Sequence, residues 1–120
     1  MPETIQKIQE LRSIYIDEND QNVLIEFEKK VKRALLTLNL KENDGIKMIL
    51  EKYEKDIANI NTLLLKDENM KENERQLLFL KRKWCEDFIN LFKIAESTIE
   101  HVDSVVNNNI FQAQEDGLIE

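Results

Sequence analysis

One segment governs the architecture expected of this chain: it begins Asn73-Glu74-Arg75-Gln76-Leu77-Leu78-Phe79-Leu80 and runs to about Asn107. Apolar residues recur along it every three or four positions, the period of an α-helix, at residues 77, 80, 84, 88, 91, 95, 99, 102 and 106. No Gly or Pro interrupts it, which predicts one helix of about 50 Å at 1.5 Å per residue. Asn73 and Gln76 fit a capping box at its start, and the run Asn107–Asn109 is predicted as its end.

The apolar stripe of this long helix divides into two halves of different composition. The first half is rich in aromatic residues and leucine, which are typically buried, and it predicts core positions at Leu77, Leu80, Trp84, Phe88, Leu91 and Phe92. The second half is β-branched, a composition often found where two helices form a seam. We therefore expect an oligomer seam at Ala95, Ile99, Val102, Val105 and Val106.

Three shorter amphipathic helices are predicted before it, over residues 3–16, 21–38 and 44–65. The connections between them are short and polar, which favours antiparallel neighbours. The fold class expected is all-α: an antiparallel bundle of about four helices with one long C-terminal helix. We expect a single domain over residues 1–109 and a short acidic tail over residues 110–120.

The predicted helix lengths do not match. The second and third helices span about 27–33 Å and the long helix about 50 Å, so the far half of its apolar stripe needs cover from elsewhere. The first helix could fold back over it, or a second copy of the chain could cover it. We favour the second copy, which makes the expected partner the protein itself, as a homodimer, or another protein.

Composition limits the classes of function. The 120 residues include two Gly and one Pro and are 42% hydrophobic and 34% charged, as expected for a helical, water-soluble chain. One cysteine cannot form an internal disulfide, which favours the cytoplasm, and no apolar run reaches the ~20 residues of a membrane span. The net charge is -7, and residues after Lys93 include six acids and no Lys or Arg. We therefore expect no direct nucleic-acid binding, because phosphate affinity needs a basic surface.

The acidic end suggests a second hypothesis. Glu96, Glu100 and Asp103 could form an acidic face that docks on a basic nucleic-acid-binding protein, as a small inhibitor from a phage or mobile element would. Two basic clusters, Lys29–Arg33 and Lys81–Lys83, are interleaved with acids at helical spacing, and we interpret them as solvated helix faces.

No nucleophilic or metal site is predicted. Cys85 and the only histidine, His101, are 16 residues apart on one helix, too far for a Cys–His pair within it. His101 is interpreted as a surface residue, because the chain has no Glu-x-x-His motif of the kind that di-iron bundles use.

Two weak metal-binding patterns remain. Residues Asp17–Glu28 have oxygen-bearing side chains at the spacing of a calcium-binding loop, but Asn22 stands where glycine is expected. A turn with Asp20 or Asn19 as helix cap explains the same residues. The fragments Glu51–Glu54 and Glu100–Asp103 match those with which all-α nucleotide pyrophosphohydrolases hold Mg²⁺, but the gap between them is too long for consecutive helices.

The leading hypothesis is a non-enzymatic adaptor or assembly module that acts through an exposed apolar helix face, with no cofactor. The acidic inhibitor is the alternative, and a Mg²⁺-dependent pyrophosphohydrolase is the least favoured.

Overall fold

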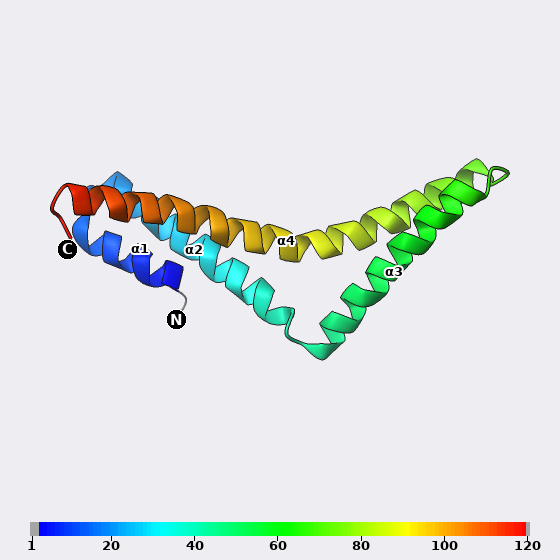
Figure 1. Cartoon of the computed structure of the whole chain (residues 1–120), viewed down its shortest axis with the longest axis horizontal. Coiled ribbons are helices and arrows are strands. Elements are labelled where there is room, and N and C mark those ends of the chain that lie inside the picture. Colours follow the sequence, from blue (N-terminus) through cyan, green and yellow to red (C-terminus); the bar gives the residue numbers. More distant parts are fainter. Residues whose placement is uncertain (1–2, 120) are drawn as a thin grey trace. The chain divides into compact units, whose positions relative to one another are not determined.

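The chain folds into four α-helices. The computed structural model describes residues 3–119, and this part of the chain contains no strand. The helices are α1 (Glu3–Ile14), α2 (Glu18–Leu40), α3 (Asp44–Lys66) and α4 (Glu72–Glu115) (Figure 1). The prediction of an all-α chain with a long, unbroken C-terminal helix is confirmed, and α4 has 44 residues.

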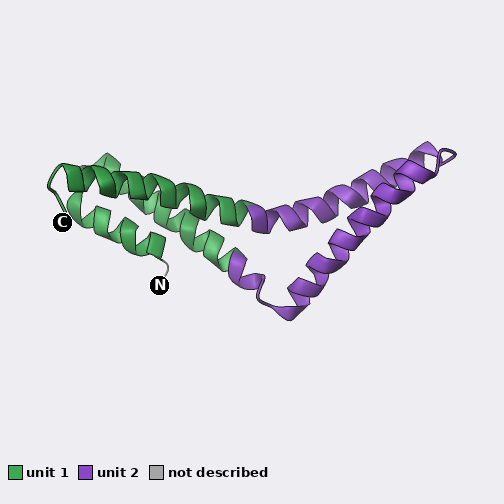
Figure 2. Ribbon diagram, in the orientation of Figure 1, with its two compact units in different colours: residues 1–37, 94–120 green, residues 38–93 purple. Residues whose placement is uncertain are grey.

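The helices are distributed over two compact units (Figure 2). Unit 1 contains residues 1–37 and 94–120, and unit 2 contains residues 38–93. Unit 1 therefore combines α1, most of α2 and the second part of α4, whereas unit 2 combines α3 with the first part of α4. Helix α4 contributes to both units, and the single domain that we expected over residues 1–109 stays a prediction.

Two helices begin at residues other than the predicted caps. The Asp17 carboxylate accepts the backbone N–H groups of Asn19 at 2.8 Å and Asp20 at 3.3 Å, so Asp17 is the N-cap of α2. The choice of Asp20 or Asn19 was wrong by two or three residues. Helix α4 begins at Glu72, which places Asn73 inside the first turn, so the predicted capping box is not the start of this helix.

Helix α4 continues past the asparagine run to Glu115. Gly117 then adopts a left-handed conformation with φ of 74°. The N–H of Leu118 donates to the Ala113 carbonyl at 2.9 Å, and the N–H of Gly117 donates to the Gln114 carbonyl at 3.1 Å. This pair of bonds is a Schellman motif. Residues 110–115 of the predicted tail are therefore helical, and Glu120 lies outside the described residues.

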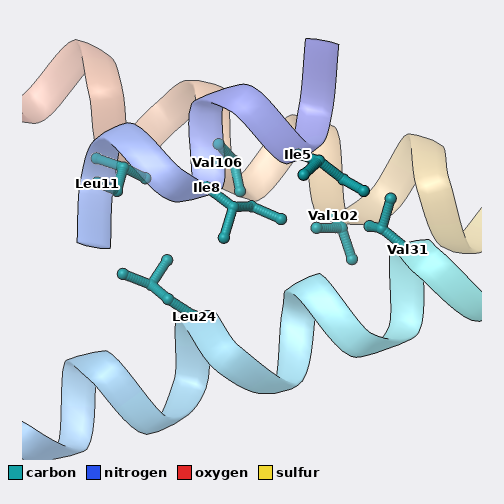
Figure 3. Packing of buried hydrophobic residues seen from close by; sticks show 7 residues of the cluster. All are labelled: Ile5, Ile8, Leu11, Leu24, Val31, Val102 and Val106. Atoms are coloured by element: carbon teal, nitrogen blue, oxygen red, sulfur yellow. The ribbon is translucent and has the colours of Figure 1, made fainter. Parts of the chain in front are cut away.

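The core of unit 1 is built from three helices (Figure 3). Apolar side chains of α1, α2 and α4 point toward one another, and the cluster is formed by Ile5, Ile8, Leu11, Leu24, Val31, Val102 and Val106. The far half of the α4 stripe is thus covered by α1 and α2 of the same chain. The sequence left two alternatives for covering this half of the stripe, the first helix of the same chain or a second copy. In the structure the first helix folds back over it.

Asp103 on α4 connects that helix to α1 through polar contacts. Its Oδ1 accepts a hydrogen bond from the Thr4 hydroxyl at 2.8 Å and one from Lys7 Nζ at 3.3 Å. Asn107 donates to Oδ2 at 3.1 Å. The Thr4 hydrogen bond is the main reason that the pKa of Asp103 is lowered; burial opposes the shift and Lys7 reinforces it.

Glu28 on α2 connects that helix to α1 through polar contacts, as Asp103 does for α4. Its carboxylate accepts hydrogen bonds from Arg12 Nη1 at 2.9 Å and Gln9 Nε2 at 3.2 Å, and Lys32 lies 3.5 Å away. Burial on its own would raise the pKa of Glu28, but the Gln9 hydrogen bond and the charges of Lys32 and Arg12 outweigh it, so the pKa is lowered. These two carboxylates hold α1 against α2 and α4.

Unit 2 is a helical hairpin in which α3 runs antiparallel to the first part of α4. The Tyr53 and Phe88 rings meet edge to face with centroids 5.3 Å apart, and Arg82 Nη1 donates to Asn61 Oδ1 at 2.8 Å. The side chains of Ile60 and Phe92 are buried. Asn61 lies after Tyr53 in α3, whereas its partner Arg82 lies before Phe88 in α4, as antiparallel packing requires.

Candidate protein-interaction surface

Four of the residues predicted as core are exposed. Leu77 and Trp84 are each 66% exposed, and Leu80 and Leu91 are also exposed. Their assignment to the core was wrong, whereas Phe92 is buried and Phe88 is half-buried. The physical reason is that unit 2 gives α4 one long neighbour, α3, and a single helix covers only part of a wide apolar face.

Three of these exposed residues, Leu77, Leu80 and Trp84, border a groove along one flank of the α3–α4 hairpin. The groove has a volume of about 400 Å³ and is lined by Lys52, Tyr53, Asp56, Leu77, Leu80, Lys81, Trp84 and Cys85. Apolar and aromatic groups make up most of its wall, with two lysines and one aspartate among them. We refer to this side of unit 2 as the open flank.

The opposite flank of the same hairpin is different in chemistry. A smaller hollow of about 240 Å³ lies there, lined by Glu54, Ile57, Glu86, Ile89, Asn90 and Lys93. Four of these six side chains are charged or carry an amide. Large apolar side chains of unit 2 are also exposed elsewhere, at Met48, Leu65 and Phe79, but these line neither hollow. Only the open flank combines exposed apolar residues with a groove, and the polar flank supplies control positions for experiments.

Unit 1 shows what covers such a groove. There α1 supplies Ile5, Ile8 and Leu11, three apolar residues at three-residue spacing, to the space beside α2 and α4. No third helix takes that place among the described residues of unit 2. Because the walls are helical and the exposed residues repeat at helical spacing, the open flank has the features of a surface that receives another helix.

The predicted oligomer seam lies inside unit 1. Val102 is 2% exposed, Val106 is fully buried and Ala95 is buried, while Ile99 and Val105 are half-buried. These side chains contribute to unit 1 itself and are not a free surface for a second copy. The seam assignment is corrected accordingly, because α1 and α2 already occupy this face.

The predicted acidic face is only partly a surface. Glu96 and Glu100 are exposed, but Asp103 is half-buried and hydrogen-bonded to Thr4, Lys7 and Asn107. A carboxylate held in this way stabilises the packing of α1 on α4. Asp103 therefore has a structural role that the sequence pattern did not indicate.

The structure gives Cys85 the environment of a packing residue. Its side chain is buried, and burial together with the nearby Asp56 raises the pKa of its thiol, which disfavours the thiolate. His101 is exposed and belongs to unit 1, whereas Cys85 belongs to unit 2.

The weak metal-binding patterns have structural explanations. Asp17 caps α2 through its side chain, and Glu28, the last position of the calcium-like spacing, is held by Arg12 and Gln9. Glu51 and Glu54 belong to unit 2, whereas Glu100 and Asp103 belong to unit 1. Within residues 3–119, no group of three or more His, Cys, Asp and Glu side chains is placed to hold a metal ion.

The basic clusters contain several ion pairs with neighbouring acids. Lys29 lies 3.5 Å from Glu26, and Arg82 lies 3.8 Å from Glu86. Arg82 also stacks over the Phe79 ring at 5.0 Å. These contacts are the kind expected of solvated helix faces.

No protein-family model matches the sequence, and no curated protein or solved structure matches it. None of the helices in the described part of the chain combines the length and apolar character needed to cross a bilayer.

Sequence reasoning missed the α3 side of the groove: Lys52, Tyr53 and Asp56 were not assigned to any site. One signal could have found it. The first predicted helix has a short apolar stripe, so it can cover only one end of a helix as long as α4, and the other end must then remain open beside α3.

Proposed function

We propose that this protein is a non-enzymatic interaction and assembly module, and that its binding surface is the open flank of the α3–α4 hairpin. The observation that carries the proposal is the exposure of Leu77, Leu80, Trp84 and Leu91 along one side of a single helix. Large apolar side chains gathered on one side in this way are typical of protein–protein interfaces, and a central tryptophan is typical of their energetic centre.

The size of the surface supports a reversible complex. With Ile49 and Leu63 of α3, six large side chains are between 37% and 66% exposed, which amounts to on the order of 500 Å² of apolar surface. Covering it provides on the order of 10 kcal/mol of gross hydrophobic stabilisation. Association costs about 4–15 kcal/mol in lost freedom of motion, so moderate affinity is expected.

Site-specific photocrosslinking tests the proposal. A photoreactive phenylalanine analogue is placed at Trp84 on the open flank or, as a matched control, at Asn90 on the polar flank. Both positions are exposed and lie on the same helix of the same unit. In the organism that encodes the chain, we expect protein adducts from position 84 and few from position 90. Equal labelling from both positions, or none from position 84, would remove the proposal.

The acidic-inhibitor hypothesis makes a different prediction in the same experiment. It places the contact on the exposed acids of α4 in unit 1, so a probe at Glu100 would give the dominant adduct, with a basic protein. Salt would weaken that adduct strongly, whereas an apolar contact at position 84 would persist.

A further inference from the structure

The open flank carries two rows of residues with a seven-residue repeat. On α3 the row is Ile49, Asp56 and Leu63, and on α4 it is Leu77, Trp84 and Leu91. Residues seven apart lie on one side of a helix. Asp56 and Trp84 line the same groove. The antiparallel pairings of Tyr53 with Phe88 and of Asn61 with Arg82 place Leu63 within one helical turn of the level of Leu77, and Ile49 within one turn of the level of Leu91. The two rows therefore match to within one helical turn, with one carboxylate and one indole near the centre.

The charge of unit 2 is balanced. Residues 38–93 contain 11 acids and 11 bases, whereas residues 1–37 and 94–120 contain 13 acids and 6 bases, which accounts for the whole net charge of -7. Two copies of unit 2 can approach without net repulsion, and two copies of unit 1 cannot. The groove itself contains charges of both signs, since Lys52, Lys81 and Asp56 all line it. A surface that binds an identical surface needs both signs of charge.

We infer that the open flank is occupied by a second copy of this chain, so that two α3–α4 hairpins form a four-helix bundle. The two-fold axis lies along the helices, and the α3 row of each copy faces the α4 row of the other. This arrangement sets Leu63 against Leu77 and Ile49 against Leu91, and it offers Asp56 the indole N–H of Trp84. A two-fold axis perpendicular to the helices would instead place Asp56 of one copy opposite Asp56 of the other. Repulsion between the two carboxylates disfavours that arrangement.

The area is sufficient for such a dimer. Each copy contributes on the order of 500 Å² of apolar surface from the two rows and Leu80, and the flanking charged side chains add more. The total for two copies then approaches the roughly 1,200–2,000 Å² of stable interfaces. The inference rests on the proposed function, since it names the partner of the same surface.

Sedimentation equilibrium tests the pairing. For the full chain, we expect the mass to rise from monomer toward dimer between submicromolar and tens of micromolar concentration. Leu77→Glu, at an exposed position, should weaken association at least 30-fold with unchanged helical content by circular dichroism. Asn90→Glu on the polar flank is the matched control and should associate like the wild type. A wild-type monomer at every concentration, or a Leu77→Glu dimer of wild-type affinity, would overturn the inference.

Mixed disulfide formation tests the orientation. In a Cys85→Ala background whose association is first verified by sedimentation, copies with Leu63→Cys are mixed with copies with Leu77→Cys and oxidised. We expect the mixed dimer to crosslink more than either variant alone. Preferential crosslinking of Leu77→Cys with Leu91→Cys would show the axis to run across the helices and would overturn this arrangement.

The two proposals fail separately. If the purified chain is monomeric but position 84 gives adducts with other proteins, the second copy is excluded and the interaction module stands. If position 84 gives no adduct of any mass, the proposed function itself fails. An adduct of twice the mass of the chain, lost in Leu77→Glu, is the result that we expect.

Discussion

Thr4 and Asp103 are 99 residues apart in the chain, and their side chains are joined by a hydrogen bond of 2.8 Å. The contact connects the first turn of α1 to the second half of α4. It matters because α1 is the helix that covers the valines of α4, and its position decides which part of the long apolar stripe is buried. Removing the contact should therefore loosen unit 1 and leave unit 2 unaffected.

Thr4→Ala should lower the free energy of unfolding by about 1–2 kcal/mol, since the hydroxyl donates to a charged group that is partly shielded from water. Urea denaturation followed by circular dichroism measures the change. Ser104→Ala, at an exposed position on α4, is the control and should have little effect. Equal stability of both variants would show that the Thr4 contact does not anchor α1.

The core and the open flank should respond differently to truncation. Ile8→Ala removes a fully buried side chain of unit 1 and should cost about 3 kcal/mol. Leu77→Ala removes a mostly exposed one and should change the stability of the monomer by less than about 0.5 kcal/mol. Denaturation at low protein concentration measures both, and the reverse order of effects would mean that the assignment of core and surface is wrong.

Acid should destabilise unit 1 through Glu28 and Asp103. The folded-state pKa values of both are lowered from their ordinary values of 4.5 and 3.8. Their stabilising contribution is therefore present above those values and is lost as pH falls through the folded-state pKa values. Urea midpoints measured from about pH 5 to about pH 3 should fall more steeply in the wild type than in a Glu28→Gln, Asp103→Asn double variant. Parallel curves would contradict this assignment.

The end of α4 depends on Gly117. Its φ of 74° is strained for any residue with a side chain, and an added Cβ would meet nothing within 4 Å, so the cost of Gly117→Ala is conformational. We expect about 1 kcal/mol of destabilisation and faster amide hydrogen exchange at Leu118, whose N–H donates to the Ala113 carbonyl. Asn108→Ala, in the exposed middle of the last helical turns, should not change exchange there. Unchanged exchange in Gly117→Ala would show that the Schellman motif is not needed to end the helix.

The sequence was sufficient to predict the four helices, because their apolar residues recur at helical spacing and polar turns separate them. It also indicated that α4 is longer than the helices that pack against it. Periodicity shows which side of a helix is apolar, but it does not show which neighbour covers it. Leu77 and Val106 belong to one continuous stripe of α4, yet the first is 66% exposed and the second is fully buried.

Two features misled the assignment of the site. Trp84 was placed in the core because aromatic residues are usually buried, and the valines were placed at a seam because β-branched residues are common there. In both cases the length of α1 would have predicted the buried part of α4 better than residue composition did, because α1 covers only one end of α4. The end of α4 was also misplaced, since Gly117 is a stronger stop signal than the run Asn107–Asn109.

Trp84 is the only tryptophan, so its fluorescence tests most directly whether the open flank is open. Acrylamide quenching is measured at submicromolar concentration, where we expect monomer. The reference is a Trp84→Phe, Phe92→Trp variant, which moves the indole to a buried position on the same helix. We predict that Trp84 is quenched several times more efficiently than the reference and becomes protected as concentration rises. A Trp84 as protected as the reference, in a chain that sedimentation shows to be monomeric, would contradict the existence of an exposed apolar flank.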